Sequence, residues 1–216
     1  MFFAVIGKPQ TWRNVGYLLL AFPLGIFYFV FLVVGLSLGF GLIITLLGIP
    51  LLVGVMAGAY GLGEFERAIT NYLLGIDTPA SHRLSVPEGW WAKVKTLITS
   101  SETWKRILYL FLEFPLGIVG FTLAVVTGAM FALVVSPLFY TQGWWAEGFD
   151  WLSSWWVVDE LWEALVVAIG GILVGFVGLH VMNGVAGLWG IIAKGLLGPS
   201  GQAQPAQEPA QPLPSP

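Results

Sequence analysis

The chain has 216 residues, of which 57% are hydrophobic and only 10% are charged. A soluble domain carries about 25% charged residues, so this chain cannot cover a water-facing surface, and lipid must surround most of it. The net charge of −3 gives no reason to expect a nucleic-acid partner. The absence of cysteine excludes disulfides, thiolate metal sites and a thiol nucleophile.

The chain begins with a short arm, residues 1–10, that lacks both a basic n-region and a small-residue cleavage site. Such a sequence is not typical of a removable signal peptide. We therefore expect the first apolar segment to stay in the mature protein.

Residues 14–63 contain no charged side chain. Fifty residues of helix are about 75 Å long, roughly twice the length of one bilayer crossing, so this stretch predicts two spans. Gly35, Gly39 and Gly41 are the expected breakers between a span near 15–38 and a second near 42–62. With residues 64–75, these spans form a first membrane hairpin, residues 11–75.

Prolines and glycines mark expected kinks and contacts in these spans. Pro23 and Pro50, and Pro115 further along the chain, are expected to bend their helices. The small residues Gly54, Gly58 and Gly61 favour close helix packing. Packing among the four spans is the main interpretation, and homodimerisation through this face is the alternative.

Residues 76–102 are predicted to be a cytoplasmic loop containing a short helix after Pro87, which lies in the membrane interface with Trp90, Val94, Leu97 and Ile98 on one face. A second hairpin, 103–199, has spans near 107–135 and 164–192. Between those spans lies a Trp-rich outer loop, residues 137–163. The Pro/Gln/Ala-rich segment 200–216 is predicted to be a disordered cytoplasmic tail.

One stretch occurs twice. Residues 11–29 and 103–121 are identical at eleven of nineteen positions, including Phe-Pro-Leu-Gly-Ile, at an offset of 92. A fainter repeat with an offset of 123 continues in the second helix of each hairpin, for example from Gly61 to Gly184. The repeat predicts an all-α membrane protein with four transmembrane helices, arranged as two parallel-duplicated hairpins with short interfacial helices.

The basic residues indicate an orientation. Of the nine Lys and Arg side chains, Lys8 and Arg13 lie near the N-terminus, six lie in the central segment between the uncharged spans (residues 67–106), and Lys194 follows the last predicted span. None lies in the two hairpin loops. The positive-inside rule then predicts a multi-pass protein of the cell membrane with both termini in the cytoplasm and the acidic Trp-rich loop outside.

Three polar residues within the spans are candidates for function. Glu113 is the one acid inside a span, and a charge in the bilayer is costly enough to suggest a role. The alternative is that Glu113 lies near the inner interface and reaches towards cations or water. His180 and Asn183 lie one turn apart and could bind a ligand, although a packed, hydrogen-bonded pair is the simpler interpretation.

The Trp-rich loop has two interpretations. Its aromatic residues are typical of a belt at the outer interface. Alternatively, they form an aromatic and acidic cup for a cationic ligand. The candidate ligand-binding residues are Trp144, Trp145, Trp151, Trp155, Trp156, Asp159 and Glu160. No pattern in the sequence indicates a catalytic residue, a cofactor or a metal site, so we do not expect an enzyme.

Several motifs together resemble a known family. A Trp-Arg start and Tyr-Leu-Leu-Leu-x-Phe-Pro-Leu-Gly are followed by Leu-Gly-Ile-Pro-Leu-Leu, a second Phe-Pro-Leu-Gly helix and a closing Leu-Leu-Gly-Pro-Ser. Over about residues 11–200 this order is similar to the putative sensor domain of prokaryotes. That domain is a four-helix membrane region often found ahead of a histidine kinase. This chain has no kinase motif, so the resemblance implies that a signal passes to a separate protein.

Three functions remain open on the sequence. The first is a membrane sensor that lacks its own catalytic domain and passes an envelope or membrane signal to a separate histidine kinase or regulator. The second is a small transporter or lipid-handling protein with Glu113 and His180 on a polar path. The third is a structural membrane protein that forms homo-oligomers through its glycine faces.

Overall fold

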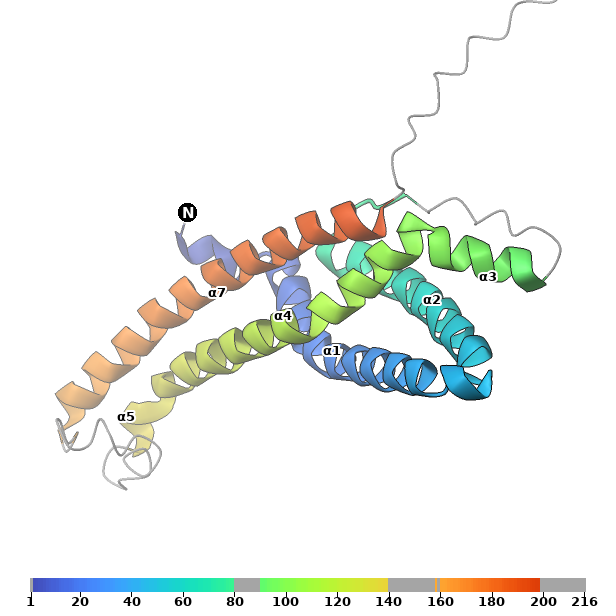
Figure 1. Ribbon diagram of the computed structural model, residues 1–216. Helices are drawn as coiled ribbons and strands as arrows, with labels where there is room; N and C mark the ends of the chain where they lie inside the picture. Colours follow the sequence, from blue (N-terminus) through green and yellow to red (C-terminus); the bar gives the residue numbers. More distant parts are fainter. Residues whose placement is uncertain (1, 80–89, 140–157, 159, 199–216) are drawn as a thin grey trace, which may run out of the picture.

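The computed structural model describes residues 2–79, 90–139, 158 and 160–198, with side chains for all of these except 90–93 and 139. In chain order its elements are η1 (Phe2–Val5), α1 (Pro9–Gly41), η2 (Ile43–Thr45), α2 (Gly48–Leu74), α3 (Trp90–Thr99), α4 (Ser101–Ala132), η3 (Leu133–Val135), α5 (Ser136–Phe139) and α7 (Leu161–Leu197). No strand occurs within these ranges (Figure 1).

Four of these helices are long and apolar enough to cross a membrane: α1, α2, α4 with its continuation to Leu138, and α7. The predicted all-helical membrane fold is confirmed. Helices α1 and α7 extend beyond the predicted spans at both ends. Helix α2 continues past Glu64, Glu66 and Arg67 to Leu74, as expected from the glycine that follows.

The turn of the first hairpin lies later than predicted. Helix α1 continues through Gly35 and Gly39, where a Cβ atom would collide with the side chains of Val55 and Leu52 of α2. These two glycines therefore let the two helices approach closely and do not break α1. The turn itself follows Gly41 and includes Leu46, whose φ of 61° is left-handed. A Cβ at the first residue of α2 would collide with the carbonyl oxygen of Gly39, so the turn closes only with glycine there.

The three predicted kinks have different outcomes. Pro23 and Pro115 lie inside α1 and α4, as expected. Pro50 is the third residue of α2, so the prediction of a kink inside a span is wrong. In the first helical turn a backbone N–H has no intrahelical partner to lose, and proline is tolerated there.

Helices α1 and α4 pack against each other at the repeated Phe-Pro-Leu-Gly sequence. A Cβ on Gly25 would lie 2.7 Å from the carbonyl oxygen of Glu113, and a Cβ on Gly117 would lie 2.7 Å from that of Ala21. These contacts are equivalent under the offset of 92. The contact also places equivalent aromatic rings together in two stacked pairs, Phe22 with Phe121 and Phe29 with Phe114. The duplication in the sequence thus appears in the structure as an approximate twofold symmetry of the contacts between α1 and α4.

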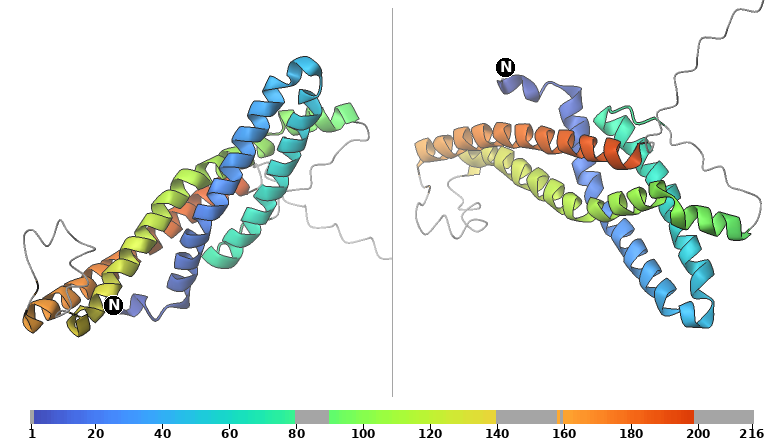
Figure 2. Two further views of the ribbon diagram at one scale, coloured as in Figure 1. Left: turned by 90° about the horizontal axis from the view of Figure 1, so that it is seen from below. Right: turned by 45° about the horizontal axis from the view of Figure 1, so that its top comes forward.

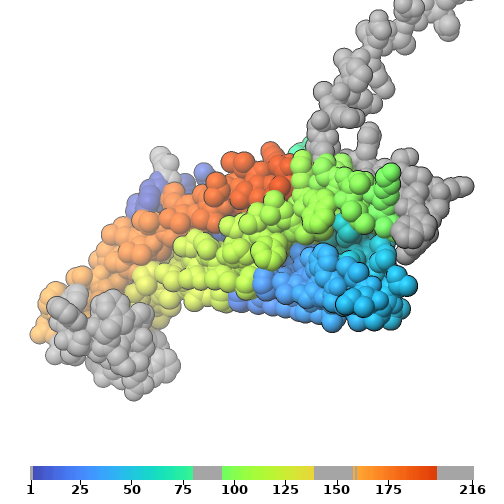
Figure 3. Space-filling view, viewed as in Figure 1, coloured from blue at the N-terminus to red at the C-terminus, as the bar shows by residue number. Residues whose placement is uncertain are grey.

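Along this contact the residue order is reversed between the two helices. Leu18 lies against Gly120, whereas Phe29 lies against Phe111. The hairpins consequently diverge, and the α1–α2 turn and the α5 end of the second hairpin lie at opposite extremes of the molecule (Figures 1 and 2). In the space-filling view α7, α4 and the α1–α2 hairpin form three successive bands on one face (Figure 3).

The glycines of α2 do not all pack inside the bundle. A Cβ placed on Gly58 would lie 2.7 Å from the ring of Phe31, but Gly54 and Gly61 have nothing within 4 Å of that position. The prediction of internal packing is therefore wrong for Gly54 and Gly61, which lie on the outer face of α2.

Equivalent hydrogen bonds also occur at the start of each repeat. The indole Nε1 of Trp12 donates to the carbonyl oxygen of Ile6 at 2.9 Å, and that of Trp104 donates to Ile98 at 2.8 Å. Each bond joins a spanning helix to the segment before it, the turn after η1 in the first repeat and α3 in the second. The predicted helix after Pro87 is present as α3, with Val94 buried and Ile98 exposed.

Candidate functional site

A group of polar side chains lies inside the bundle, where all four spanning helices meet. We call it the buried polar cluster. Its members are Tyr17 and Tyr28 of α1, Glu66 of α2, Tyr109 and Glu113 of α4, and Trp189 of α7. Every one of these side chains is at most 1% exposed. Buried polar groups are costly unless they are hydrogen-bonded, so the contacts within this cluster decide what it can do.

The repeat explains why these residues meet. Tyr17 and Tyr109 are equivalent at the offset of 92, and Glu66 and Trp189 are equivalent at the offset of 123. Each of the four lies eight residues from the end of its helix, about 12 Å along the axis. They therefore occupy one level of the bundle. The two phenol oxygens are 3.0 Å apart, close to the approximate twofold axis.

The second helix of each hairpin contacts the tyrosine of its own hairpin. Tyr17 Oη lies 3.1 Å from Oε1 of Glu66, and Trp189 Nε1 donates to Tyr109 Oη at 3.0 Å. Tyr28 adds a donor from a deeper position, with its hydroxyl 2.9 Å from Oε2 of Glu66. The symmetry is thus broken chemically, because one half supplies a carboxyl group where the other supplies an indole N–H.

Glu113 completes the cluster from α4. Its Oε1 lies 3.3 Å from Tyr17 Oη, and its Oε2 is buried with no hydrogen-bond partner among the described residues. The interpretation in which Glu113 reaches towards cations or water at the inner interface does not fit, because its side chain is 1% exposed and points into the bundle. Its repeat equivalent is Ala21, so this carboxyl group is an addition to the shared framework.

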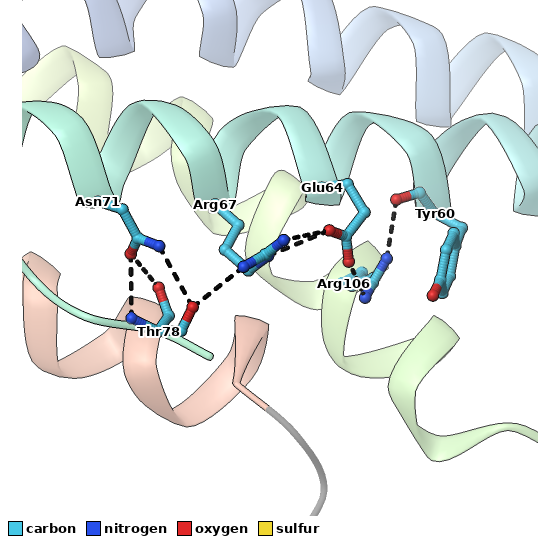
Figure 4. Close-up of polar contacts among 6 residues, drawn as sticks. All are labelled: Tyr60, Glu64, Arg67, Asn71, Thr78 and Arg106. Atoms are coloured by element: carbon cyan, nitrogen blue, oxygen red, sulfur yellow. Dashed lines mark hydrogen bonds and ion pairs between the residues drawn. The ribbon is translucent and has the colours of Figure 1, made fainter. Parts of the chain in front are cut away.

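A second polar network lies nearby and joins α2 to α4 (Figure 4). Arg106 is 2% exposed, donates to the carbonyl oxygen of Tyr60 at 2.9 Å and pairs with Glu64. Its guanidinium carbon also lies 3.6 Å from the centre of the Tyr60 ring. Arg67 binds the same carboxylate at 2.7 Å, so two cations from different hairpins share Glu64.

This network extends into the segment after α2. Arg67 Nη1 donates to the carbonyl oxygen of Thr78 at 3.0 Å, and Asn71 Nδ2 donates to the same oxygen at 3.2 Å. Asn71 also accepts from the backbone N–H of Thr78 at 3.1 Å. The beginning of the central segment is therefore tied to the helix ends (Figure 4).

The two polar residues predicted on α7, His180 and Asn183, contact different parts of the molecule. Asn183 accepts from Nδ2 of Asn14 at 2.7 Å and donates to Thr11 at 3.1 Å, so it links α7 to α1. His180 is exposed instead, its ring stacks on Phe2 at 4.8 Å, and its Nδ1 lies 2.8 Å from the carbonyl oxygen of Phe176. The interhelical role fits Asn183, but the two side chains do not form one pair.

The predicted ligand residues of the outer loop mostly lie outside the described residues: Trp144, Trp145, Trp151, Trp155, Trp156 and Asp159. Glu160 is described and exposed. Its side chain caps α7 in a reciprocal arrangement with Glu163, and it accepts a hydrogen bond from Trp162. The aromatic cup stays a prediction. No group of three or more His, Asp or Glu side chains able to hold a metal occurs in the described ranges.

The structure brings together residues that the sequence interpretation missed. Glu66 lies in the run Glu64-Phe-Glu-Arg67, which on the sequence marks the charges beyond the second span. Tyr17 and Tyr109 were visible as identical positions of the repeat but carried no chemical signal on their own. Glu66 and Trp189 are equivalent at the offset of 123, and this equivalence could have been used to predict that both lie near those tyrosines.

These features define an α-helical, multi-pass membrane protein with a polar core. A family model described as "Putative sensor" matches residues 17–197, which include all of the buried polar cluster. The match covers most of the chain, and the chain belongs to this family. Comparison with curated proteins and with solved structures gave no match.

Proposed function

We propose that the chain acts as a membrane sensor. It responds to the bilayer or to the outer side of the membrane and passes the signal to a separate histidine kinase or regulator. The membership of the sensor family supports the first part. The observation that carries the second part is the polar network around Glu64, because it connects the packing of the hairpins to the segment between them.

The network offers a route for coupling. Arg106 comes from the second hairpin, and Glu64 and Arg67 come from the first. A displacement of α4 relative to α2 would change which acceptors Arg106 reaches. Because Arg67 and Asn71 also bind the carbonyl oxygen of Thr78, the change would extend to the start of the central segment. Coupling of this kind requires a physical element with two arrangements, and the contact between the hairpins is the element we propose.

The proposed orientation has both hairpins inserted from the cytoplasmic side, with the central segment inside the cell. The distribution of basic residues supports it. Helix α1 has 33 residues and is about 50 Å long, whereas the hydrocarbon core is about 30 Å thick, so the helix is tilted, bent or extends beyond the core. Two steeply tilted helices related by a twofold axis along the membrane normal diverge in the membrane plane. This arrangement agrees with the reversed residue order between α1 and α4.

A lipid-handling role is the second candidate, and a groove on the outer surface favours it. The groove has a volume of about 230 Å³ and is lined by Leu32, Val33, Leu36, Trp104, Ile107, Leu108 and Phe111. This lining suits an acyl chain. It includes neither Glu113 nor His180, so the groove supports contact with lipid and not a polar path for transport.

The experiment that tests the sensor proposal is site-specific photo-crosslinking in the native membrane. A photoreactive amino acid is placed at Ile98 of α3, which is 47% exposed, and as a control at Ile191 of α7, which is 70% exposed. We expect a histidine kinase or response regulator to be captured from position 98 and not from 191. Recovery at both positions of only lipid or copies of the chain, with both variants fully inserted, would contradict the proposal.

A further inference from the structure

The hydrogen-bond geometry around Tyr17 has a consequence for protonation. Three oxygen atoms lie within 3.3 Å of Tyr17 Oη: Oε1 of Glu66, Oε1 of Glu113 and Oη of Tyr109. We assign one proton to each of these three contacts, which lie at or slightly beyond the usual range of O–H···O hydrogen bonds. Tyr17 and Tyr109 can supply one proton each, so the third contact needs a proton from elsewhere.

The remaining contacts show where that proton resides. Trp189 donates to Tyr109, whose own proton is then free to point to Tyr17. Tyr28 donates to Glu66, and Tyr17 can donate to the same carboxylate. Glu66 thus receives two phenol protons, an arrangement that stabilises a carboxylate. In the remaining contact, Oε1 of Glu113 lies 3.3 Å from Tyr17 Oη. With the Tyr17 proton directed to Glu66, the proton in this contact is assigned to Glu113.

We infer that Glu66 and Glu113 form a proton-binding site, in which one proton carried by Glu113 joins α4 to Tyr17 of α1 and through it to Glu66 of α2. The pair then holds a single negative charge. Two negative carboxylates in this interior, with no cation in contact among the described residues, would be strongly unfavourable, because burial penalises each unpaired charge. The site concerns the state of the bundle itself and does not depend on the proposed signalling partner.

A proton fits this site better than a metal ion does. The described residues supply two carboxyl groups here and no third His, Asp or Glu side chain. The contacts between oxygens, at 2.9 to 3.3 Å, lie at or slightly beyond the usual range of O–H···O hydrogen bonds.

Other ionisable groups near the site do not remove the need for the proton. Helix α1 contributes Tyr17 and Tyr28, α4 contributes Tyr109, and α7 contributes Trp189, which does not titrate. The nearest arginine on α4 is Arg106, which is bound to Glu64 and Tyr60. Loss of the shared proton at high pH would therefore place two unneutralised charges between α2 and α4. We expect the packed bundle to become less stable as pH rises.

Infrared spectroscopy of the full-length protein in detergent tests this assignment. The C=O stretch of a protonated carboxylic acid is distinct from the bands of a carboxylate, and it is followed over a pH series. We expect the wild type to show this band near neutral pH and Glu113→Gln to lose it. Glu64→Gln is the matched control on α2 and should leave the band unchanged, because Glu64 is ion-paired.

Two further measurements keep the inference falsifiable if a glutamate variant does not fold. Tyr17→Phe removes the hydroxyl that accepts from Glu113 and should shift the band without abolishing it. Addition of Na⁺, Ca²⁺ or Mg²⁺ at constant pH should leave the band in place. Absence of the band from folded wild-type protein, its persistence in Glu113→Gln, an unchanged band in Tyr17→Phe, or its loss on addition of a cation would each overturn the proton assignment.

Discussion

Some charged side chains of this protein lie in its interior, where apolar side chains otherwise pack. Arg106 is the clearest case, since it is almost completely buried and yet has a carboxylate, a carbonyl oxygen and an aromatic face as partners. A buried charge is tolerated when its partners are in place and is strongly destabilising when one partner is removed. Its repeat equivalent, Asn14, makes an uncharged contact with α7.

Arg106→Gln should therefore lower the free energy of unfolding by about 2–3 kcal/mol, because Glu64 and the carbonyl of Tyr60 lose a donor in a largely dehydrated site. The measurement is thermal or denaturant unfolding of the purified protein in one detergent. The control is Arg13→Gln. Arg13 is exposed, and its guanidinium lies 5.8 Å from the ring of Tyr72, so less than about 0.5 kcal/mol should be lost. Equal losses in both variants would contradict the described role of Arg106.

The sequence predicted the site only in part, and particular residues show why. Glu113 was found because a lone acid in an apolar run is conspicuous. Glu66 was missed because it lies among other charges, and only the packing of α2 in the bundle reveals that it is turned inward. The tyrosines and Trp189 could not be assigned from composition, because the same residue types also form interfacial belts. The packing of four helices decides which of them meet.

Helix contacts in this protein depend on glycine at two equivalent positions. At Gly25 and Gly117 a Cβ atom would lie within 3 Å of backbone atoms of the opposing helix, which cannot move aside as a side chain can. By contrast, Gly16 of α1 and Gly128 of α4 have nothing within 4 Å of the same position. One residue type therefore has opposite roles on a single helix.

Gly25→Ala and Gly117→Ala should each destabilise the bundle by about 1–3 kcal/mol, because α1 and α4 must separate to admit a methyl group. Gly16→Ala and Gly128→Ala should be neutral or stabilising by up to about 1 kcal/mol, since alanine is the better helix former. Unfolding of all four variants in the same detergent is the measurement. A loss of stability in Gly16→Ala as large as in Gly25→Ala would refute this account of the contact.

The number and type of the elements followed from the length of the uncharged runs, and the repeat indicated their pairing. The position of the first turn did not follow from the sequence. Gly35 and Gly39 were expected to break the helix, whereas both allow close contact with α2. Glycine serves either purpose in a membrane helix, and which one applies depends on the neighbouring helix. Pro50 was misplaced for a related reason, because α2 begins only two residues before it.

At the scale of the whole molecule, the two hairpins share one contact and point away from it in opposite directions (Figures 1 and 2). The approximate twofold axis passes near Tyr17 and Tyr109. If the axis lies along the membrane normal, both hairpin turns are outside and the central segment, with its basic residues, is inside. If the axis lies in the membrane plane, the turns are on opposite sides. The charge distribution supports the first arrangement.

The measurement that tests this account most directly is cysteine labelling in intact cells. The chain has no cysteine, so labelling of a single-cysteine variant reports on one position. The variants are Ile44→Cys in the first hairpin turn, Leu138→Cys in α5 and Ile98→Cys in α3. With a membrane-impermeant maleimide, we expect positions 44 and 138 to be labelled from outside, and position 98 only after permeabilisation. Labelling of position 44 and protection of position 138, or the reverse, would contradict insertion of both hairpins from one side.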